Sequence, residues 1–397
     1  MRRRDFFGSA AAGTLASAAC STPAPPDRNA AAIKVTGIEV FTLRVNDRGN
    51  WVVIRLQTDA GISGIGDASH AGRNDPQVAK LHEYSELMGG RSIYDIEWLR
   101  GRVHGDFGEY GRATSCALSA IEQALFDIQG QVAGVPCWAL FGGKLHKEIR
   151  NYANINRGTD DRTPKGFAVN VESAIAAGFD AVKMAPFDGM PRDGSAAEIA
   201  AHTQLGVDCA RAAREVLGPD RDLLLDAHSN FDVERGRAVI KMLAPLNLFW
   251  LEELTRPLDD LATLREAATM PTAGGESLFG IRETLEYVRY DPVEILMPDV
   301  KYIGGMLELK KVSAIAEAAG MQVAPHGPAS PIGNLAAMHV CASLPNQLIL
   351  EFSHSDAPWR AELTDPPEEL VNGRLRVPDT PGLGVKLNEK TLAERRV

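Results

Sequence analysis

Hydrophobic and polar residues alternate near the start of the chain and indicate three short strands. Apolar side chains recur at about every second position in residues 33–41, 51–56 and 61–67. Alternation of this kind is typical of strands that bury one face, and the turn residues Asp59-Ala60-Gly61 precede the third strand. The pattern predicts a three-stranded antiparallel sheet.

The apolar period then changes to that of a helix. In residues 114–132 the apolar side chains return every three or four positions, and the Gly134-Val135-Pro136 tripeptide that follows would end a helix. Together with the three strands, this helix predicts an α+β module that covers residues 33–147.

Short apolar runs alternate with helical patterns from residue 148 to residue 357. Eight strands separated by helices are typical of a (β/α)-barrel of the TIM type. An open dinucleotide-binding sheet is disfavoured, because no Gly-x-Gly-x-x-Gly motif opens a helix. The expected strands are residues 150–154, 181–185, 223–227, 249–252, 273–276, 295–298, 322–325 and 348–351.

Two segments lack a regular apolar period. The loop at residues 186–194 follows the second expected strand and is rich in proline and glycine; such loops often shape substrate pockets. Residues 358–397 contain several prolines, and we expect this C-terminal segment to pack back on the N-terminal module.

The composition is that of an ordinary, acidic globular protein. Of 397 residues, 45% are hydrophobic and 24% are charged, and the formal net charge is −10. This length favours one large domain plus a smaller one. Because no run of Lys and Arg follows the N-terminus, we expect a small-molecule partner and no nucleic acid.

Residues 1–32 are predicted to be an export signal and linker outside the fold. Arg2-Arg3-Arg4-Asp5-Phe6-Phe7 and the small apolar residues after it are typical of a twin-arginine signal, and the apolar stretch is too short to span a bilayer. Cys20 offers a site for a lipid anchor, with simple cleavage as the alternative. We therefore expect a periplasmic protein or a membrane-anchored lipoprotein.

Three acidic residues each close an expected strand. Asp226, Glu252 and Glu276 are spaced 26 and 24 residues apart, about one strand and one helix each. In a parallel barrel this spacing places them at the C-terminal ends of adjacent strands, where the active sites of such barrels lie. Three carboxylates brought together repel, and a hard divalent cation removes the repulsion. The all-oxygen set favours Mg²⁺ over Zn²⁺.

Polar residues also end the later strands. Asp299, His326 and Glu351 follow the sixth, seventh and eighth apolar runs. A lone histidine on a strand is more often structural, but Asp299 and His326 lie one strand-helix unit apart and so belong to adjacent strands. A carboxylate beside an imidazole orients its ring and raises its proton affinity, which predicts a catalytic base.

Two further residues are candidates for the same site. His228 lies two positions after Asp226 and so shares its side of the strand, at the edge opposite His326. Lys183 ends the second strand and would enter the site if its side chain faces inward; the alternative is a lysine that extends to solvent.

The predicted site is suited to removing a proton next to a carboxylate. A bound dication acidifies the α-proton of a carboxylate substrate so that an imidazole can remove it, and the resulting enediolate is stabilised by the metal. If the β-carbon carries a hydroxyl, a second acid can expel it as water, and His228 is placed for that role.

These residues resemble a known family. The stretches Ser119-Ala120-Ile121-Glu122 and Pro298-Asp299-Val300-Lys301, with the three carboxylates, resemble the mandelate racemase and muconate lactonizing enzyme branch of the enolase superfamily. The resemblance covers nearly the whole chain after residue 32. Within that branch, Asp226-Ala227-His228 and residues 324–333 are most similar to galactonate-type sugar acid dehydratases.

The resemblance implies both a fold and a set of roles. It implies a (β/α)7β barrel with an N-terminal α+β capping domain, which the C-terminal tail completes. It implies Mg²⁺ on the three carboxylates, the Asp299–His326 pair as the base, and His228 as the acid. Racemases of this branch use a Lys-x-Lys motif on the second strand, and here Lys183-Met184-Ala185 lacks the second lysine.

The expected function is Mg²⁺-dependent dehydration of an aldonate or aldarate to a 2-keto-3-deoxy acid. One alternative is a racemase, epimerase or cycloisomerase that acts on a carboxylate substrate. Another is an exported protein that binds a sugar acid without turnover. Relatives are commonly multimers, so we expect a homo-oligomer.

Overall fold

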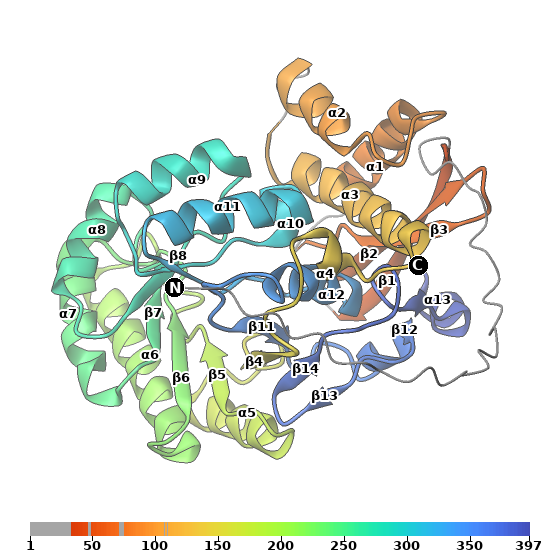
Figure 1. Ribbon diagram of the computed structural model, residues 1–397. Coiled ribbons are helices and arrows are strands. Elements are labelled where there is room, and N and C mark those ends of the chain that lie inside the picture. The colour runs from red at the N-terminus through yellow and green to blue at the C-terminus, as the bar shows by residue number, and fades with distance from the viewer. Residues whose placement is uncertain (1–32, 47–48, 71–74, 107, 109) are drawn as a thin grey trace, which may run out of the picture.

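The computed structural model describes residues 33–46, 49–70, 75–106, 108 and 110–397 (Figure 1). Its N-terminal part is an antiparallel sheet in the order β1-β2-β3, with Leu43 opposite Trp51 in the register of the first pair. The predicted meander is therefore confirmed. The strands are β1 (Val35–Asn46), β2 (Gly49–Thr58) and β3 (Ser63–Asp67).

Helix α3 packs closely on this sheet because β3 contains two glycines. A Cβ added at Gly64 would lie 2.1 Å from the Ala124 carbonyl oxygen, and one at Gly66 would lie 2.0 Å from that of Ala120. Only glycine permits this approach. The helices of this module are α1 (Asp75–Met88), α2 (Ile96–Arg100) with a π-helical turn at Gly101–Asp106, α3 (Arg112–Ala133) and α4 (Cys137–Leu140).

Eight parallel strands follow in chain order, as predicted, and form a closed ring. β11 pairs in parallel with β4, and Gln347, which precedes β11 in the chain, bridges Val323 of β10. The strands are β4 (Glu148–Asn154), β5 (Ala181–Met184), β6 (Asp222–Asp226), β7 (Trp250–Glu252), β8 (Thr272–Gly274), β9 (Ile295–Leu296), β10 (Gln322–Val323) and β11 (Leu350–Ser353).

Helices surround this ring and alternate with its strands (Figure 1). Helix α6 begins at a capping box, in which Ser195 accepts from the Glu198 N–H while the Glu198 carboxylate accepts from the Ser195 N–H. The helices are α5 (Pro164–Ala176), α6 (Ala196–Leu217), α7 (Val233–Leu243), α8 (Leu258–Ala267), α9 (Gly280–Arg289), α10 (Val300–Ile303), α11 (Met306–Ala318) and α12 (Pro331–Cys341), with a 3-10 turn at Ala244–Leu246.

Some barrel strands are shorter than the apolar runs that predict them. β9 ends before Pro298 and β10 ends before Pro325, because proline has no N–H for the strand ladder. β8 ends at Gly274, so Glu276 lies just beyond its strand. A plug of buried side chains fills the ring below these ends: Tyr152, Ala181, Leu224, Trp250, Ala273, Ile295, Met297, Ala324 and Ile349.

A buried carboxylate fixes the N-terminal module to the barrel. Glu122 of α3 accepts hydrogen bonds from the N–H groups of Met306 and Leu307 at the start of α11. The carboxylate can approach because Gly305 has φ of 131° and no side chain. Burial raises the pKa of Glu122 to about 8. This contact holds the capping module over the barrel.

The C-terminal segment returns to the N-terminal module, but it first extends the barrel sheet. The hairpin of β13 (Leu370–Val371) and β14 (Arg374–Arg376) pairs antiparallel with the first half of β4, a pairing that the sequence does not predict. The chain then forms α13 (Glu389–Arg395), which packs on β1 beside the cap (Figure 1). A 3-10 turn (Arg360–Leu363) and the strand pair β12 (Thr364–Asp365) and β15 (Lys386–Leu387) complete the tail.

The predicted export signal and Cys20 lie in residues 1–32, outside the described residues, so both stay predictions, as do the domain limits and the oligomeric state. Within the described ranges, no helix is long and apolar enough to cross a membrane.

Candidate active site

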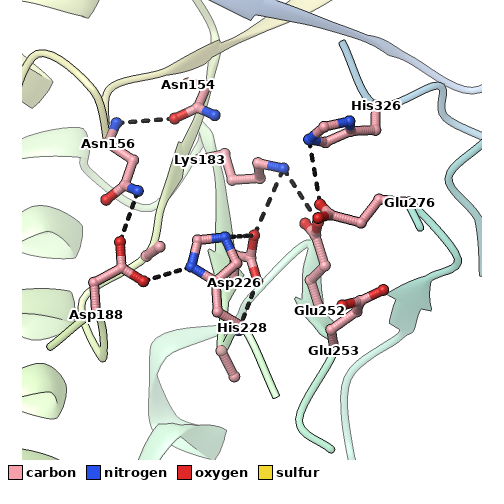
Figure 2. Close-up of polar contacts among 12 residues, drawn as sticks. Asn154, Asn156, Lys183, Asp188, Asp226, His228, Glu252, Glu253, Glu276 and His326 are labelled. Atoms are coloured by element: carbon pink, nitrogen blue, oxygen red, sulfur yellow. Dashed lines mark hydrogen bonds and ion pairs between the residues drawn. The ribbon is translucent and has the colours of Figure 1, made fainter. Parts of the chain in front are cut away.

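Three carboxylates meet at the C-terminal end of the barrel. Asp226 is the last residue of β6, Glu252 is the last residue of β7, and Glu276 follows β8. One oxygen of each lies within 4.8 Å of the others, and both Asp226 and Glu252 are buried (Figure 2). The structure therefore brings together the three residues that the strand spacing predicts as metal ligands.

The three carboxylates of this cluster repel one another, and added positive charge would stabilise them. Burial and the neighbouring charge of Asp226 hold the pKa of Glu252 well above its usual range. Burial also raises the pKa of Asp226, but the nearby His228 and Lys183 outweigh it and lower this pKa to about 2. Three converging carboxylate oxygens are the donors that a hard dication prefers, so the residues present fit Mg²⁺.

Lys183 faces into the cluster rather than toward solvent. Its Nζ lies 3.2 Å from Glu252 Oε1, 3.5 Å from Glu351 Oε1 and 3.9 Å from Asp226 Oδ2, and the residue is 2% exposed. The solvent-facing alternative is therefore wrong. Charge from the carboxylates opposes the effect of burial and holds the pKa of Lys183 well above its usual range.

Asp299 and His326 form the hydrogen-bonded pair that the sequence predicts. His326 Nδ1 lies 2.8 Å from Asp299 Oδ2, and its Nε2 lies 3.2 Å from Glu276 Oε2. Lys301 Nζ lies 2.9 Å from the same Asp299 oxygen. Burial raises the pKa of Asp299, but Lys301 and His326 outweigh it and lower that pKa to about 2. The paired carboxylate thus aims Nε2 of the imidazole at the cluster.

Glu351 lies beside both His326 and Lys183. Its Oε2 accepts a hydrogen bond of 2.9 Å from Gly327 N and lies 3.9 Å from His326 Nε2. Its Oε1 accepts from the Asn154 side chain and faces Lys183. Both oxygens are thereby held, so Glu351 organises the groups around it.

His228 lies at the other edge of the cluster. Its backbone has φ of 45°, its N–H donates to Asp226 Oδ1 at 2.8 Å, and its Nε2 lies 2.9 Å from Asp226 Oδ2. The charge of Asp226 raises the pKa of His228 to about 12. His228 and His326 therefore reach the carboxylates from opposite sides (Figure 2).

The structure adds polar residues that the sequence analysis missed. Asp188, on the long loop after β5, contacts His228 Nδ1, and its other oxygen accepts from the Asn156 side chain at 2.9 Å. Asn156 N in turn donates to Asn154 Oδ1 at 2.8 Å. Asn154 ends the first barrel strand, so the rule that marked the other strand ends could have found it. Nothing in the sequence indicates the path of the loop that carries Asp188.

The chain matches the models of two known protein families. The family described as Enolase C-terminal domain-like matches residues 166–391, and the Mandelate racemase / muconate lactonizing enzyme N-terminal domain matches residues 40–142. A crystal structure of a mandelate racemase/muconate lactonizing enzyme-like protein from Rubrobacter xylanophilus superposes with a TM-score of 0.84 at 28% identity, over 92% of this chain and 98% of that one.

Two relatives of named activity are similar over nearly their whole length. The D-galactonate dehydratase of Ralstonia pickettii is 30% identical over 91% of this chain and 94% of its own. The D-galactarolactone cycloisomerase of Agrobacterium fabrum is 29% identical over 91% of this chain and 95% of its own. The predicted resemblance is thereby confirmed, and the chain belongs to the mandelate racemase and muconate lactonizing enzyme branch of the enolase superfamily.

Proposed function

We propose that the protein is a Mg²⁺-dependent dehydratase that converts a sugar acid into a 2-keto-3-deoxy acid. The observation that carries the proposal is the placement of two imidazoles, His326 and His228, at opposite edges of one three-carboxylate cluster. Elimination of water needs a base for one proton and an acid for the departing hydroxyl. The activity named for the Ralstonia relative supports the choice of reaction.

Asp226, Glu252 and Glu276 would hold the metal. Bound Mg²⁺ would supply the positive charge that makes the proton next to a substrate carboxylate acidic. Lys183 places a second positive charge within 4 Å of two of these carboxylates and of Glu351. A substrate carboxylate would thus enter a pocket whose cationic groups offset its charge.

His326 would remove the α-proton. Its Nδ1 is held by Asp299, so the lone pair of Nε2 faces the site and accepts the proton from carbon. His228 Nε2 would give a proton to the β-hydroxyl as the carbon–oxygen bond breaks, and water leaves. The enol that remains becomes the 2-keto-3-deoxy acid by moving a proton to carbon 3. His326 gains one proton and His228 loses one, so the total number of protons on the enzyme does not change.

A substrate screen tests this proposal. The purified protein is incubated with Mg²⁺ and a library of aldonic and aldaric acids, and 2-keto acids are detected with semicarbazide. We expect product from one or a few stereochemically related acids, and none after Mg²⁺ is removed with EDTA. Absence of product from every acid, with a protein that binds Mg²⁺, would contradict dehydration.

A second candidate is cycloisomerisation or epimerisation of a carboxylate, which the similarity to the Agrobacterium cycloisomerase favours. His326 would serve one face of the substrate and His228 or Lys183 the other. Incorporation of deuterium at the α-carbon in D₂O, with no loss of water, would favour this reaction. The lack of a lysine at Ala185 speaks against the lysine-based version.

Binding without turnover is the remaining alternative. A receptor for a sugar acid has no use for the Asp299–His326 pair, so His326→Asn should leave its affinity largely intact. The proposed enzyme should instead lose nearly all turnover and α-proton exchange in this variant.

A further inference from the structure

Asp188 and His228 form a second carboxylate–imidazole pair besides that of Asp299 and His326. It lies across the carboxylate cluster from the His326 ring (Figure 2). Asp188 Oδ1 contacts Nδ1 of His228, and Nε2 of the same ring lies 2.9 Å from Asp226 Oδ2. The side chain of His228 is 38% exposed, so a substrate can reach it. Asp188 therefore contacts the ring nitrogen of His228 that faces away from the carboxylate cluster.

The carboxylate of Asp188 is itself held in one orientation. Its Oδ2 accepts a hydrogen bond of 2.9 Å from Asn156 Nδ2 and lies 3.3 Å from Arg162 NH2. Arg162 NH1 also donates to Asn156 Oδ1 at 2.6 Å, which fixes the amide. Because Oδ2 has these two donors, Oδ1 is left for the imidazole.

The loop that carries Asp188 is anchored by its neighbour. Phe187 is fully buried and packs edge-on against Phe231, with 5.0 Å between ring centroids. Its carbonyl accepts from Asn230 Nδ2 at 3.3 Å, and α6 approaches the ring closely because residue 206 is glycine. Contacts with Phe231, Asn230 and helix α6 thus fix the position of Asp188.

We propose that Asp188 is a positioning residue that orients His228, so that Nε2 of this histidine is presented to the β-hydroxyl of the substrate. The inference deepens the proposed dehydratase function and rests on it. With Nδ1–H donating to Asp188, the proton on Nε2 is the one that passes to the departing hydroxyl. The Nδ1 proton stays in its hydrogen bond throughout.

A hydrogen-bonded chain also joins this pair to the opposite side of the site. Asn156 N donates to Asn154 Oδ1, and Asn154 Nδ2 donates to Glu351, whose other oxygen is held by the residue after His326. The acid and the base are thus positioned by one continuous set of contacts. A surface ion pair with no role in positioning would not need these links.

Asp188→Asn tests the inference, with Asp188→Glu as the rescue variant. Asp193→Asn is the matched control, because Asp193 is exposed on the same loop. For each protein, 2-keto acid formation and deuterium exchange of the substrate α-proton are measured with Mg²⁺ in D₂O. Crystal structures of the wild type and D188N report the orientation of the His228 ring.

We expect D188N to form product about 10- to 100-fold more slowly while α-proton exchange, which depends on His326, stays within about twofold. D188E should recover part of the loss, D193N should match the wild type, and the His228 ring should turn in D188N. Product formation by D188N at the wild-type rate would overturn the inference, as would an equal loss of elimination and exchange.

Failure of the proposed function gives a different result. In that case the wild type itself forms no 2-keto acid, whether or not it exchanges the α-proton. The crystal structures then decide the positioning role alone: an unchanged His228 ring in D188N overturns it, and a turned ring supports it.

Discussion

The ammonium of Lys183 lies 3.2 Å from the carboxylate of Glu252, and both groups are buried at the centre of the site. This contact means that the protein already carries one positive charge among its proposed metal ligands. The lysine cannot satisfy all the carboxylates around it, since the pKa of Glu252 stays raised. The carboxylates of the site can therefore balance the charge of a dication in addition to that of the lysine.

Removing the lysine should destabilise the metal-free protein. In Lys183→Met the buried carboxylates lose their partner, and breaking a buried ion pair from one side costs about 3–5 kcal/mol. We expect a loss of that order in the free energy of urea unfolding with EDTA present, and partial recovery with Mg²⁺. Lys390→Met, which changes an exposed ion pair on α13, should have little effect. A K183M protein as stable as the wild type in EDTA would show that Lys183 does not stabilise the buried carboxylates.

The carboxylate triad should couple Mg²⁺ to stability. A ligand present at 100 times its Kd stabilises the folded state by about 2.7 kcal/mol, so Mg²⁺ should raise the thermal midpoint of the wild type. Glu252→Gln should abolish most of this rise and most of the heat of Mg²⁺ binding in calorimetry. Glu266→Gln, an exposed change on α8, serves as the control and should keep both. Undiminished Mg²⁺ binding by E252Q would place the metal elsewhere.

Asp299→Asn should separate catalysis from metal binding. The amide cannot orient and support the imidazole as the carboxylate does, so turnover and α-proton exchange should both fall by about 10²- to 10⁴-fold. Mg²⁺ affinity should change little, because Asp299 lies behind His326 and outside the triad. Circular dichroism checks the fold, since Asp299 also accepts from Lys301 N at the start of α10. Exchange at the wild-type rate would remove His326 from the role of base.

A buried histidine away from the site should set part of the pH dependence of stability. His339 accepts from Trp138 N, its other nitrogen faces Leu383 O, and burial lowers its pKa to about 4. Between pH 6.5 and pH 4 the unfolded chain binds a proton there that the folded chain does not, so stability falls as the pH falls through this window. The expected contribution is up to about 3 kcal/mol.

His339→Gln checks this contribution. Urea unfolding of the wild type and H339Q is compared at pH 7.5, 5.5 and 4.5. Buried acids such as Glu122 and Asp127 are present in both proteins, so the difference in pH slope isolates His339. We expect H339Q to lose less stability on acidification than the wild type. Identical slopes would mean that folding does not lower the pKa of His339.

Much of this site follows from local pattern in the sequence. Asp226, Glu252, Asp299 and His326 end apolar runs whose length and spacing are those of barrel strands, and chain order then fixes which strands are neighbours. A parallel barrel leaves few choices once the runs are recognised. The predicted strands near Pro298 and Pro325 extend beyond the observed ones, because the run of apolar residues continues past the last ladder hydrogen bond.

The remaining features depend on contacts that local pattern does not encode. Asp188 reaches His228 across 40 residues of sequence through a loop whose path is set by the burial of Phe187. Likewise, β14 of the β13–β14 hairpin pairs with the first residues of β4, below the ring. The two hairpin strands are only a few residues long, so the sequence does not indicate this pairing. In the sequence Glu122 is a polar residue within an apolar helix, and its role depends on the packing of α11 against that helix.

Proton NMR of one sugar acid substrate in D₂O with Mg²⁺ tests the proposed reaction most directly. The wild type should remove the α-proton signal and form a 2-keto-3-deoxy acid, and His326→Asn should do neither while it still binds Mg²⁺. A His326→Asn protein that still forms product, or a Mg²⁺-bound wild type that leaves the α-proton of every aldonate and aldarate in place, would contradict it.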